Sequence, residues 1–162
     1  MNRRWLHGLM TLVLGVGLGG CAFSTPFKGP GYARGIGVTL PGEGPVVVAL
    51  SRANLKPGSA GRALFWEHTS RVNATLDSQS GLVGYSLRRT LDGATGWTMT
   101  VWRDEEALRA FMRSEVHRTA ITSATASLDT ATFARFTRPR ASVPPTWDDA
   151  LVILERDGYS YR

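Results

Sequence analysis

The chain has 162 residues, 43% of them hydrophobic and 20% charged, with 19 basic residues against 13 acidic ones and a formal charge of +6. This length favours one domain with an appendage, and the composition excludes a chain that is disordered throughout. The single cysteine excludes an internal disulfide and a multi-cysteine metal cluster. Three histidines leave few ligands for a histidine-rich metal site.

The first twenty residues have the order of a signal peptide. Arg3 and Arg4 precede an apolar run from Leu9 to Leu18, and small residues follow it. The run is about ten residues long, too short for a bilayer that needs roughly 20. A buried helix is the alternative, but the glycines in this stretch disfavour it. We therefore expect residues 1–20 to be a signal peptide.

Leu18-Gly19-Gly20-Cys21 resembles the lipobox of bacterial lipoproteins, and Cys21 is the only cysteine in the chain. The resemblance implies cleavage before Cys21, lipid attachment at this residue, including palmitate, and anchoring in a membrane of the cell envelope. If the source is Gram-negative, Ala22 indicates the periplasmic side of the outer membrane. Loss of residues 1–20 leaves 17 basic against 13 acidic residues, a formal charge of +4. We expect no nucleic-acid partner at this charge.

Residues 21–44 are rich in glycine and proline, with six glycines and four prolines between Ala22 and Pro45. This composition predicts a flexible tether between membrane and domain, because it offers too little apolar surface to offset chain entropy. A short strand near Ile36–Leu40, packed on the domain as an extension, is the alternative. The domain itself is expected at residues 45–162.

The first half of this domain alternates between strand and helix patterns. Val46–Leu50 is a continuous apolar run, typical of a strand buried on both faces. Pro57-Gly58-Ser59 then breaks the chain before a helix to about Asp77. Residues 82–91 and 97–102 are expected strands, joined by a turn at residues 91–93. The expected inward stripe of the helix is Leu64, Phe65, His68, Val72 and Leu76.

Capping residues mark the helices of the second half. Asp104 caps a helix with Ala107, Leu108, Phe111 and Met112 on its buried stripe. Ser114-Glu115 is a hinge or a second cap, and residues 130–138 are a fourth strand. Thr146 caps a last helix that runs through Glu155, and its expected inward residues are Trp147, Ala150, Leu151 and Leu154.

The resulting order is β-α-β-β-α-β with an extra C-terminal helix. It predicts an α+β, ferredoxin-like fold with a four-stranded antiparallel sheet and helices on one face. Tyr85, Trp97 and Met99 are too large and apolar for an open sheet face. We therefore expect a homodimer that packs sheet against sheet.

Residues 96–111 and 114–121, with the strand at 81–87 before them, resemble the antibiotic biosynthesis monooxygenase-like group of dimeric α+β barrels. The resemblance spans roughly residues 46–138 and treats the last helix as an extension. It implies a dimeric α+β barrel in a superfamily of cofactor-free oxygenases, haem-degrading enzymes, isomerases and proteins of unknown role. Haem-degrading members carry their iron-ligating histidine about four residues beyond His117, where this chain has Ile121. We expect no cofactor.

His117 and His68 are the candidate catalytic residues. His117 shares a helix face with Ala120, Ile121 and Ala124, where it can serve as a general acid/base or as a structural histidine bonded to a backbone carbonyl. His68 lies on the apolar stripe of the first helix, so the two can converge on one cavity. Two histidines without a third ligand predict no metal site.

Aromatic residues suggest a pocket for a flat ligand, and core and dimer packing is the alternative. Either Arg88 or Arg89, whichever faces inward, can hold a carboxylate or a phenolate, and Asn73 can assist. The expected pocket-lining residues are Trp66, Tyr85, Arg88, Trp97, Trp102 and Phe111.

Two functions fit these patterns. The first is an envelope lipoprotein whose monooxygenase-like domain binds a small hydrophobic or aromatic molecule. The second is a cofactor-free oxygenase or isomerase that acts on a small aromatic substrate. Dinucleotide and phosphate loops and a nucleophile elbow are absent from the sequence.

Overall fold

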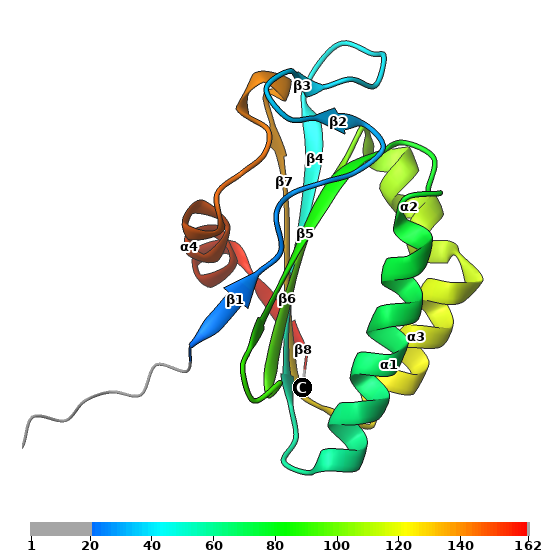
Figure 1. Ribbon diagram of the computed structural model, residues 1–162, viewed down its shortest axis with the longest axis vertical. Coiled ribbons are helices and arrows are strands. Elements are labelled where there is room, and N and C mark those ends of the chain that lie inside the picture. Colours follow the sequence, from blue (N-terminus) through cyan, green and yellow to red (C-terminus); the bar gives the residue numbers. More distant parts are fainter. Residues whose placement is uncertain (1–20, 162) are drawn as a thin grey trace, which may run out of the picture.

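The computed structural model describes residues 21–161, and its centre is a six-stranded antiparallel sheet (Figure 1). The signal peptide expected at residues 1–20 lies outside the described residues. From one edge to the other, the strands are β1 (Ala22–Ser24), β5 (Leu82–Thr90), β6 (Thr95–Trp102), β4 (Val46–Leu55), β7 (Leu128–Arg138) and β8 (Tyr159–Tyr161).

The four middle strands and the helices between them have the predicted ferredoxin-like order. The chain runs from β4 through α1 (Ser59–Leu76) to β5 and β6, and then through α2 (Glu105–Arg113) and α3 (Glu115–Thr125) to β7. In the sheet, β4 lies between β6 and β7, and every neighbouring pair is antiparallel. The predicted α+β class and its order of elements are confirmed. The sheet has two more strands than predicted, because β1 and β8 pair with its two sides.

Side-chain caps start three helices as the sequence predicts. The Asp104 carboxylate accepts a hydrogen bond from the backbone N–H of Ala107 at 2.8 Å. This bond and the neighbouring Arg103 hold the pKa of Asp104 below its usual range. Ser114 caps α3, and Thr146 caps α4 (Trp147–Asp157). Because Ser114 is in an extended conformation, it separates α2 from α3 and sets the direction of the second helix.

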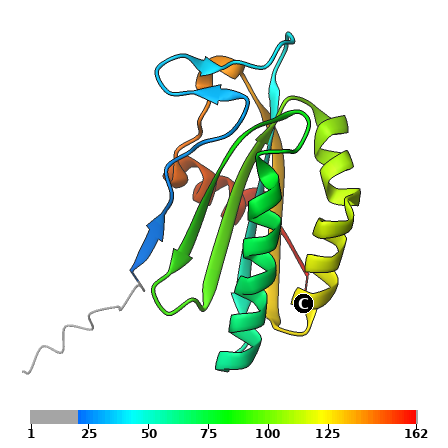
Figure 2. The ribbon, with the colours of Figure 1, turned by 45° about the vertical axis from the view of Figure 1, so that its right-hand side comes forward.

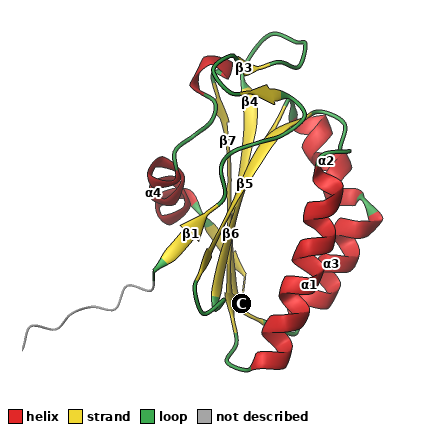
Figure 3. Cartoon of the chain, in the orientation of Figure 1, coloured by secondary structure: helices red, strands yellow, loops and turns green. Residues whose placement is uncertain are grey.

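The helices lie on both faces of the sheet. In Figures 1 and 3 the sheet is seen edge-on, with α1, α2 and α3 on one side and α4 on the other. Val46, Val48 and Leu50 point toward α4, whereas Val47 packs with the core beneath α1 and α2. The strand predicted at 46–50 is therefore buried on both faces, and it continues five residues further, to Leu55.

The segment predicted as a tether is packed against the sheet. β1 pairs with β5, and Lys28 bridges to Tyr85 through two backbone hydrogen bonds of 3.1 and 2.7 Å. A hairpin of β2 (Tyr32–Ala33) and β3 (Gly37–Val38) follows, so the alternative of an added strand near residue 36 is close to what is observed. Figure 2 shows this segment running along the sheet. Its core-packing residues are Phe27, Tyr32, Val38 and Leu40.

Two glycines explain why this segment fits so closely. A Cβ on Gly29 would lie 2.3 Å from the Cα of Gly84, and a Cβ on Gly84 would lie 2.6 Å from the ring of Phe27. Larger residues at either position would push the segment off β5. The glycine content therefore serves close packing here rather than flexibility.

The face of the sheet opposite α1–α3 is covered by the chain itself. Met99 is fully buried, and Trp97 packs against the same cluster. Trp147 of α4 donates a hydrogen bond from Nε1 to the Ser86 hydroxyl at 2.9 Å, and Ser86 donates to the Thr25 carbonyl at 2.6 Å. The premise that this face is open is therefore wrong. Tyr85 also differs from its prediction, because it pairs with Thr100 and faces the helices.

Some residues predicted on buried stripes are exposed. Leu64 lies on the outer side of α1, while Phe65 and His68 face the sheet. Met112 and Ile121 are about half exposed, because they lie at the rim of a cavity between the helices and the sheet. Among the helices of residues 21–161, none is long and apolar enough to cross a membrane.

We predict that Trp147→Ala lowers the free energy of unfolding by about 2–4 kcal/mol, because it uncovers part of the sheet and leaves Ser86 without a donor. Urea denaturation measures the loss. Val152→Ala on the exposed side of the same helix is the control, with an expected change within about 0.5 kcal/mol. Equal effects of the two substitutions would contradict the role of Trp147.

Candidate functional site

A cavity of about 240 Å³ lies between the helix layer and the sheet. It exists because the central strand β4 presents small residues, Ala49, Ser51 and Ala53, to the helices. Side chains of this size are too short to fill the layer between the sheet and the helices. Phe65 on α1 and Phe133 on β7 form apolar walls. The space is therefore encoded mainly by the middle of one strand.

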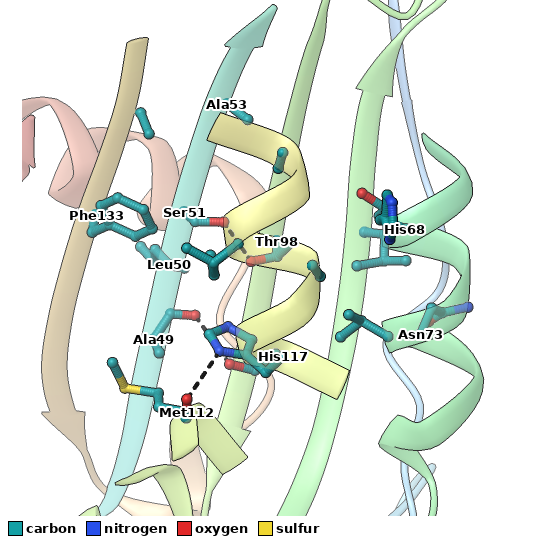
Figure 4. Close-up of a pocket in the computed structure, with 18 of the residues that line it drawn as sticks. Ala49, Leu50, Ser51, Ala53, His68, Asn73, Thr98, Met112, His117 and Phe133 are labelled. Carbon is teal, nitrogen blue, oxygen red and sulfur yellow. Dashed lines mark hydrogen bonds between the residues drawn. The ribbon is translucent and has the colours of Figure 1, made fainter. Parts of the chain in front are cut away.

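Both candidate histidines line this cavity. His68 approaches from α1 and His117 from the first turn of α3, as Figure 4 shows. The sequence predicts each histidine on an inward face of its helix, and in the structure both line the same cavity. Phe111 lines the cavity as well, but it does not fill it. Within residues 21–161, no three histidine, cysteine, aspartate or glutamate side chains are grouped as a metal ion would require.

Neighbouring groups fix the His117 ring. Its Nδ1 lies 3.3 Å from the Met112 carbonyl oxygen. A carbonyl oxygen only accepts hydrogen bonds, so Nδ1 carries the proton in the neutral ring and Nε2 has the free lone pair. The ring centroid is 4.7 Å from that of Phe111, which in turn stacks on Trp102 at 5.0 Å. The proposed structural bond to a backbone carbonyl therefore exists, and it leaves one nitrogen available as a proton acceptor.

Burial keeps His117 neutral. Desolvation lowers its pKa below the ordinary value of 6.5, and the hydrogen bond to Met112 opposes this shift only in part. A neutral imidazole accepts protons, whereas an imidazolium does not. At neutral pH His117 is thus in the form that a general base requires.

A second cavity of about 310 Å³ adjoins the first beneath α1. It extends toward β1, and Phe23, Trp66 and Arg89 are among its lining residues. Residues that line both cavities are Ser51, Ala53, Phe65, Thr69, Asn73, Leu87 and Thr98. Because these residues belong to both, the two cavities lie side by side.

The shared wall carries the main polar groups. The hydroxyls of Ser51 and Thr98 are hydrogen-bonded to each other at 2.7 Å. The Asn73 Oδ1 atom is buried and has no hydrogen-bond partner among the described residues. A buried acceptor without a donor is costly, so a rotation of the Asn73 side chain that brings Oδ1 to an O–H or N–H of a ligand would be favourable.

The six residues predicted to line a pocket have different positions. Phe111 lines the first cavity, and Trp66 lines the second while donating to the Gly93 carbonyl at 3.0 Å. Tyr85 and Trp102 line neither cavity, because both are buried in the core beneath α1 and α2. Arg88 and Trp97 border the second cavity, but they stack on each other at 5.8 Å on the side of the sheet facing α4.

Arg89 is the inward arginine. It pairs with Gly96, and its guanidinium lies over the rings of Phe23 at 5.0 Å and Trp66 at 5.4 Å. The sequence pattern does not point to Ser51, because the strand predicted at 46–50 ends before it. Thr98 lies in the strand predicted at 97–102, but nothing in the pattern marks it as a site residue. The alternation of small residues through Ala49, Ser51 and Ala53 was the signal that could have revealed the cavity.

Comparison with known proteins agrees with this geometry. Residues 47–123 match the family model described as antibiotic biosynthesis monooxygenase. No curated protein is significantly similar in sequence to this chain.

Three solved structures share the fold with a TM-score of 0.51 each. SnoaB, a cofactor-independent oxygenase from Streptomyces nogalater, is 21% identical, and the match covers 63% of this chain and 100% of SnoaB. A Pseudomonas aeruginosa protein is 20% identical over 59% of this chain and 95% of its own. A conserved protein from Methanosarcina mazei is 15% identical, and the match covers 57% of this chain and 91% of that protein.

The family match begins at the second residue of β4 and ends within α3. It includes the small residues that open the cavity and both histidines. The segments that cover the opposite face of the sheet lie outside it. This chain thus contains an antibiotic biosynthesis monooxygenase-like domain whose family match spans residues 47–123, and β1–β3, β7, α4 and β8 lie outside that match.

Proposed function

We propose that this protein is a lipid-anchored protein of the cell envelope whose domain binds a small hydrophobic, aromatic molecule bearing a hydrogen-bond donor. The buried, unpartnered Oδ1 of Asn73 in an otherwise mainly apolar cavity carries this proposal. The first cavity and its neighbour have volumes of about 240 and 310 Å³. Together they are in the range of small-molecule sites, roughly 300–1,000 Å³.

A second candidate function is cofactor-free oxygenation or isomerisation of such a molecule. It is favoured by the neutral His117 and by the likeness in fold to a cofactor-independent oxygenase. Nε2 of His117 would take a proton from an acidic carbon of the aromatic substrate. In the oxygenase the resulting carbanion would react with O₂, so that a CH₂ group and O₂ become C=O and H₂O. His68, across the cavity, is the second proton-transfer group.

The membrane anchor is proposed from the lipobox-like sequence that ends at Cys21. The Cys21 side chain is exposed and is a free thiol, as lipid attachment requires. The expected location is the periplasmic side of the outer membrane if the source is Gram-negative. Several acyl chains at one residue would hold the protein stably, whereas one chain binds only marginally.

A homodimer is consistent with the family, whose members are typically dimeric. In this chain α4 and residues 22–40 cover the sheet face on which the sequence predicts the partner. A homodimer of this protein would therefore use the outer surface of these elements or another side of the domain. We propose no contribution of a second copy to the cavity.

We predict that Asn73→Leu weakens binding of naphthol by about 1–3 kcal/mol, because the hydrogen bond to Oδ1 is lost. Naphthalene has the same shape without the hydroxyl, so its affinity should stay unchanged or rise. Calorimetric titration of both ligands measures the difference. An equal loss for naphthol and naphthalene would contradict a role of Asn73 as acceptor.

The lowered pKa of His117 predicts a pH-dependent stability. The unfolded chain binds a proton at this residue below about pH 6.5, and the folded chain binds it only at lower pH. The free energy of unfolding should therefore fall as the pH drops from 7 through the folded pKa of His117. His117→Gln should remove this part of the pH dependence, and His68→Gln is the matched control. An unchanged pH profile in His117→Gln would contradict the desolvated ring.

We predict that Cys21→Ser moves the protein from the membrane to the soluble fraction of cells, because the lipid attachment site is lost. Mass spectrometry of the wild-type protein should show a chain that begins at Cys21 and carries acyl groups. An unmodified chain that still begins at Met1, or a Cys21→Ser protein that remains in the membrane, would contradict the lipoprotein assignment.

A further inference from the structure

Cys21 is held at the edge of the sheet. Its carbonyl oxygen accepts a hydrogen bond of 3.1 Å from the backbone N–H of Leu91. The next residues pair directly with β5, Ala22 with Thr90 and Phe23 with Arg89. No flexible residue therefore separates Cys21 from the folded domain. Acyl chains on Cys21 would bring the bilayer within one side-chain length of this edge.

The surface around Cys21 carries the residues that an interface with lipid requires. Leu91, at the turn between β5 and β6, is 72% exposed, and the neighbouring Phe23 is 44% exposed. Arg89 lies over the ring of Phe23 on the same face of β5 and supplies positive charge there, whereas Asp92 is the acidic group of the turn. We call Cys21, Phe23 and Leu91 the anchor surface. Apolar side chains beside an arginine suit the boundary between headgroups and acyl chains.

The second cavity reaches the same surface. Phe23 is both part of the anchor surface and a lining residue of this cavity, together with Thr25, Trp66 and Arg89. Beyond them the cavity adjoins the one that contains His68 and His117. The strand that follows Cys21 thus borders a cavity that lies next to the candidate site under α1.

We propose that the domain lies directly on the bilayer through the anchor surface and that the second cavity opens toward the lipid, so that its ligand is an apolar molecule dissolved in the membrane. This inference rests on the lipid attachment proposed for Cys21. It adds to that function the orientation of the domain on the bilayer and the membrane as the source of the ligand. The occupant of the anchor surface is the bilayer itself, since the anchor leaves no length of chain for the domain to stand away from it.

Site-specific labels test the orientation. The lipidated protein is reconstituted in vesicles of phosphatidylethanolamine and phosphatidylglycerol, and a nitrobenzoxadiazole fluorophore is attached in Leu91→Cys or in Ile36→Cys. Ile36 is the matched control, because it is 80% exposed and lies between β2 and β3, far from β1 (Figure 1). Lipids with a nitroxide near the headgroup should quench the label at position 91 several-fold more than the label at position 36.

Equally weak quenching at both positions, in protein whose Cys21 is acylated by mass spectrometry, would overturn the orientation while leaving the lipid anchor intact. A chain without acyl groups would instead overturn the proposed anchor, and the inference would fall with it. The two failures are therefore distinguishable from the same sample.

A ligand probe tests the opening toward lipid. Bromonaphthalene dissolved in the vesicles quenches tryptophan on contact, and Trp66 lines the second cavity. In Phe23→Asp, a carboxylate at the opening should raise several-fold the bromonaphthalene content of the lipid needed for half-quenching. Ile36→Asp should leave it unchanged. An unchanged value in Phe23→Asp would show that the cavity fills from water and would overturn the lipid route.

Discussion

The unequal sizes of the residues on the two faces of β4 determine the rest of the molecule. On one face Val46, Val48 and Leu50 fill the space up to α4 and the N-terminal segment. On the other, Ala49, Ser51 and Ala53 leave a space that α1 and α3 enclose without filling. Burying one face tightly stabilises the sheet, so that the other face can keep a cavity at a tolerable cost in packing.

This cavity gives His117 its chemistry. A histidine at the start of α3 would be an ordinary surface group if α2 continued straight through it. Ser114 ends α2 in an extended conformation, and the ring of His117 then lies against Phe111 with Nδ1 toward the Met112 carbonyl. The same turn thus sets the tautomer, the burial and the orientation of the ring. Asn73 lies across the cavity on α1, and its buried Oδ1 has no hydrogen-bond partner among the described residues.

Much of the fold could be predicted from local patterns, because caps and alternation act over a few residues. Asp104, Ser114 and Thr146 each accept the hydrogen bond expected of an N-cap residue. The two histidines were also predicted from helical spacing alone. The predictions that are wrong depend on contacts between residues far apart in the chain. Tyr85 was assigned to the wrong face because the pairing of β5 with β6, including its irregularity between Leu82 and Gly84, is not visible locally.

The glycine-rich segment shows the same limit. Its composition is that of a flexible linker, yet Gly29 and Gly84, more than fifty residues apart, allow two stretches of backbone to touch. Neither glycine reveals its partner in the sequence. For the same reason a sheet face that seemed to need a second copy is covered by residues 22–40 and by α4.

Residues 21–31 also determine whether another molecule can pair with the edge of the sheet. Residues 21–31 form backbone hydrogen bonds along β5 from Thr90 to Val83. β1 makes the first of them, and the N–H groups of Thr25, Lys28 and Gly31 make the others. An outer strand with free N–H and C=O groups invites pairing with a strand of another molecule. Here the chain supplies its own strand to that position. A strand of another molecule therefore cannot pair directly with β5. On the other side of the sheet, β8 pairs only with residues 131–133 of β7, and the part of β7 beyond them carries Arg135 and Arg138.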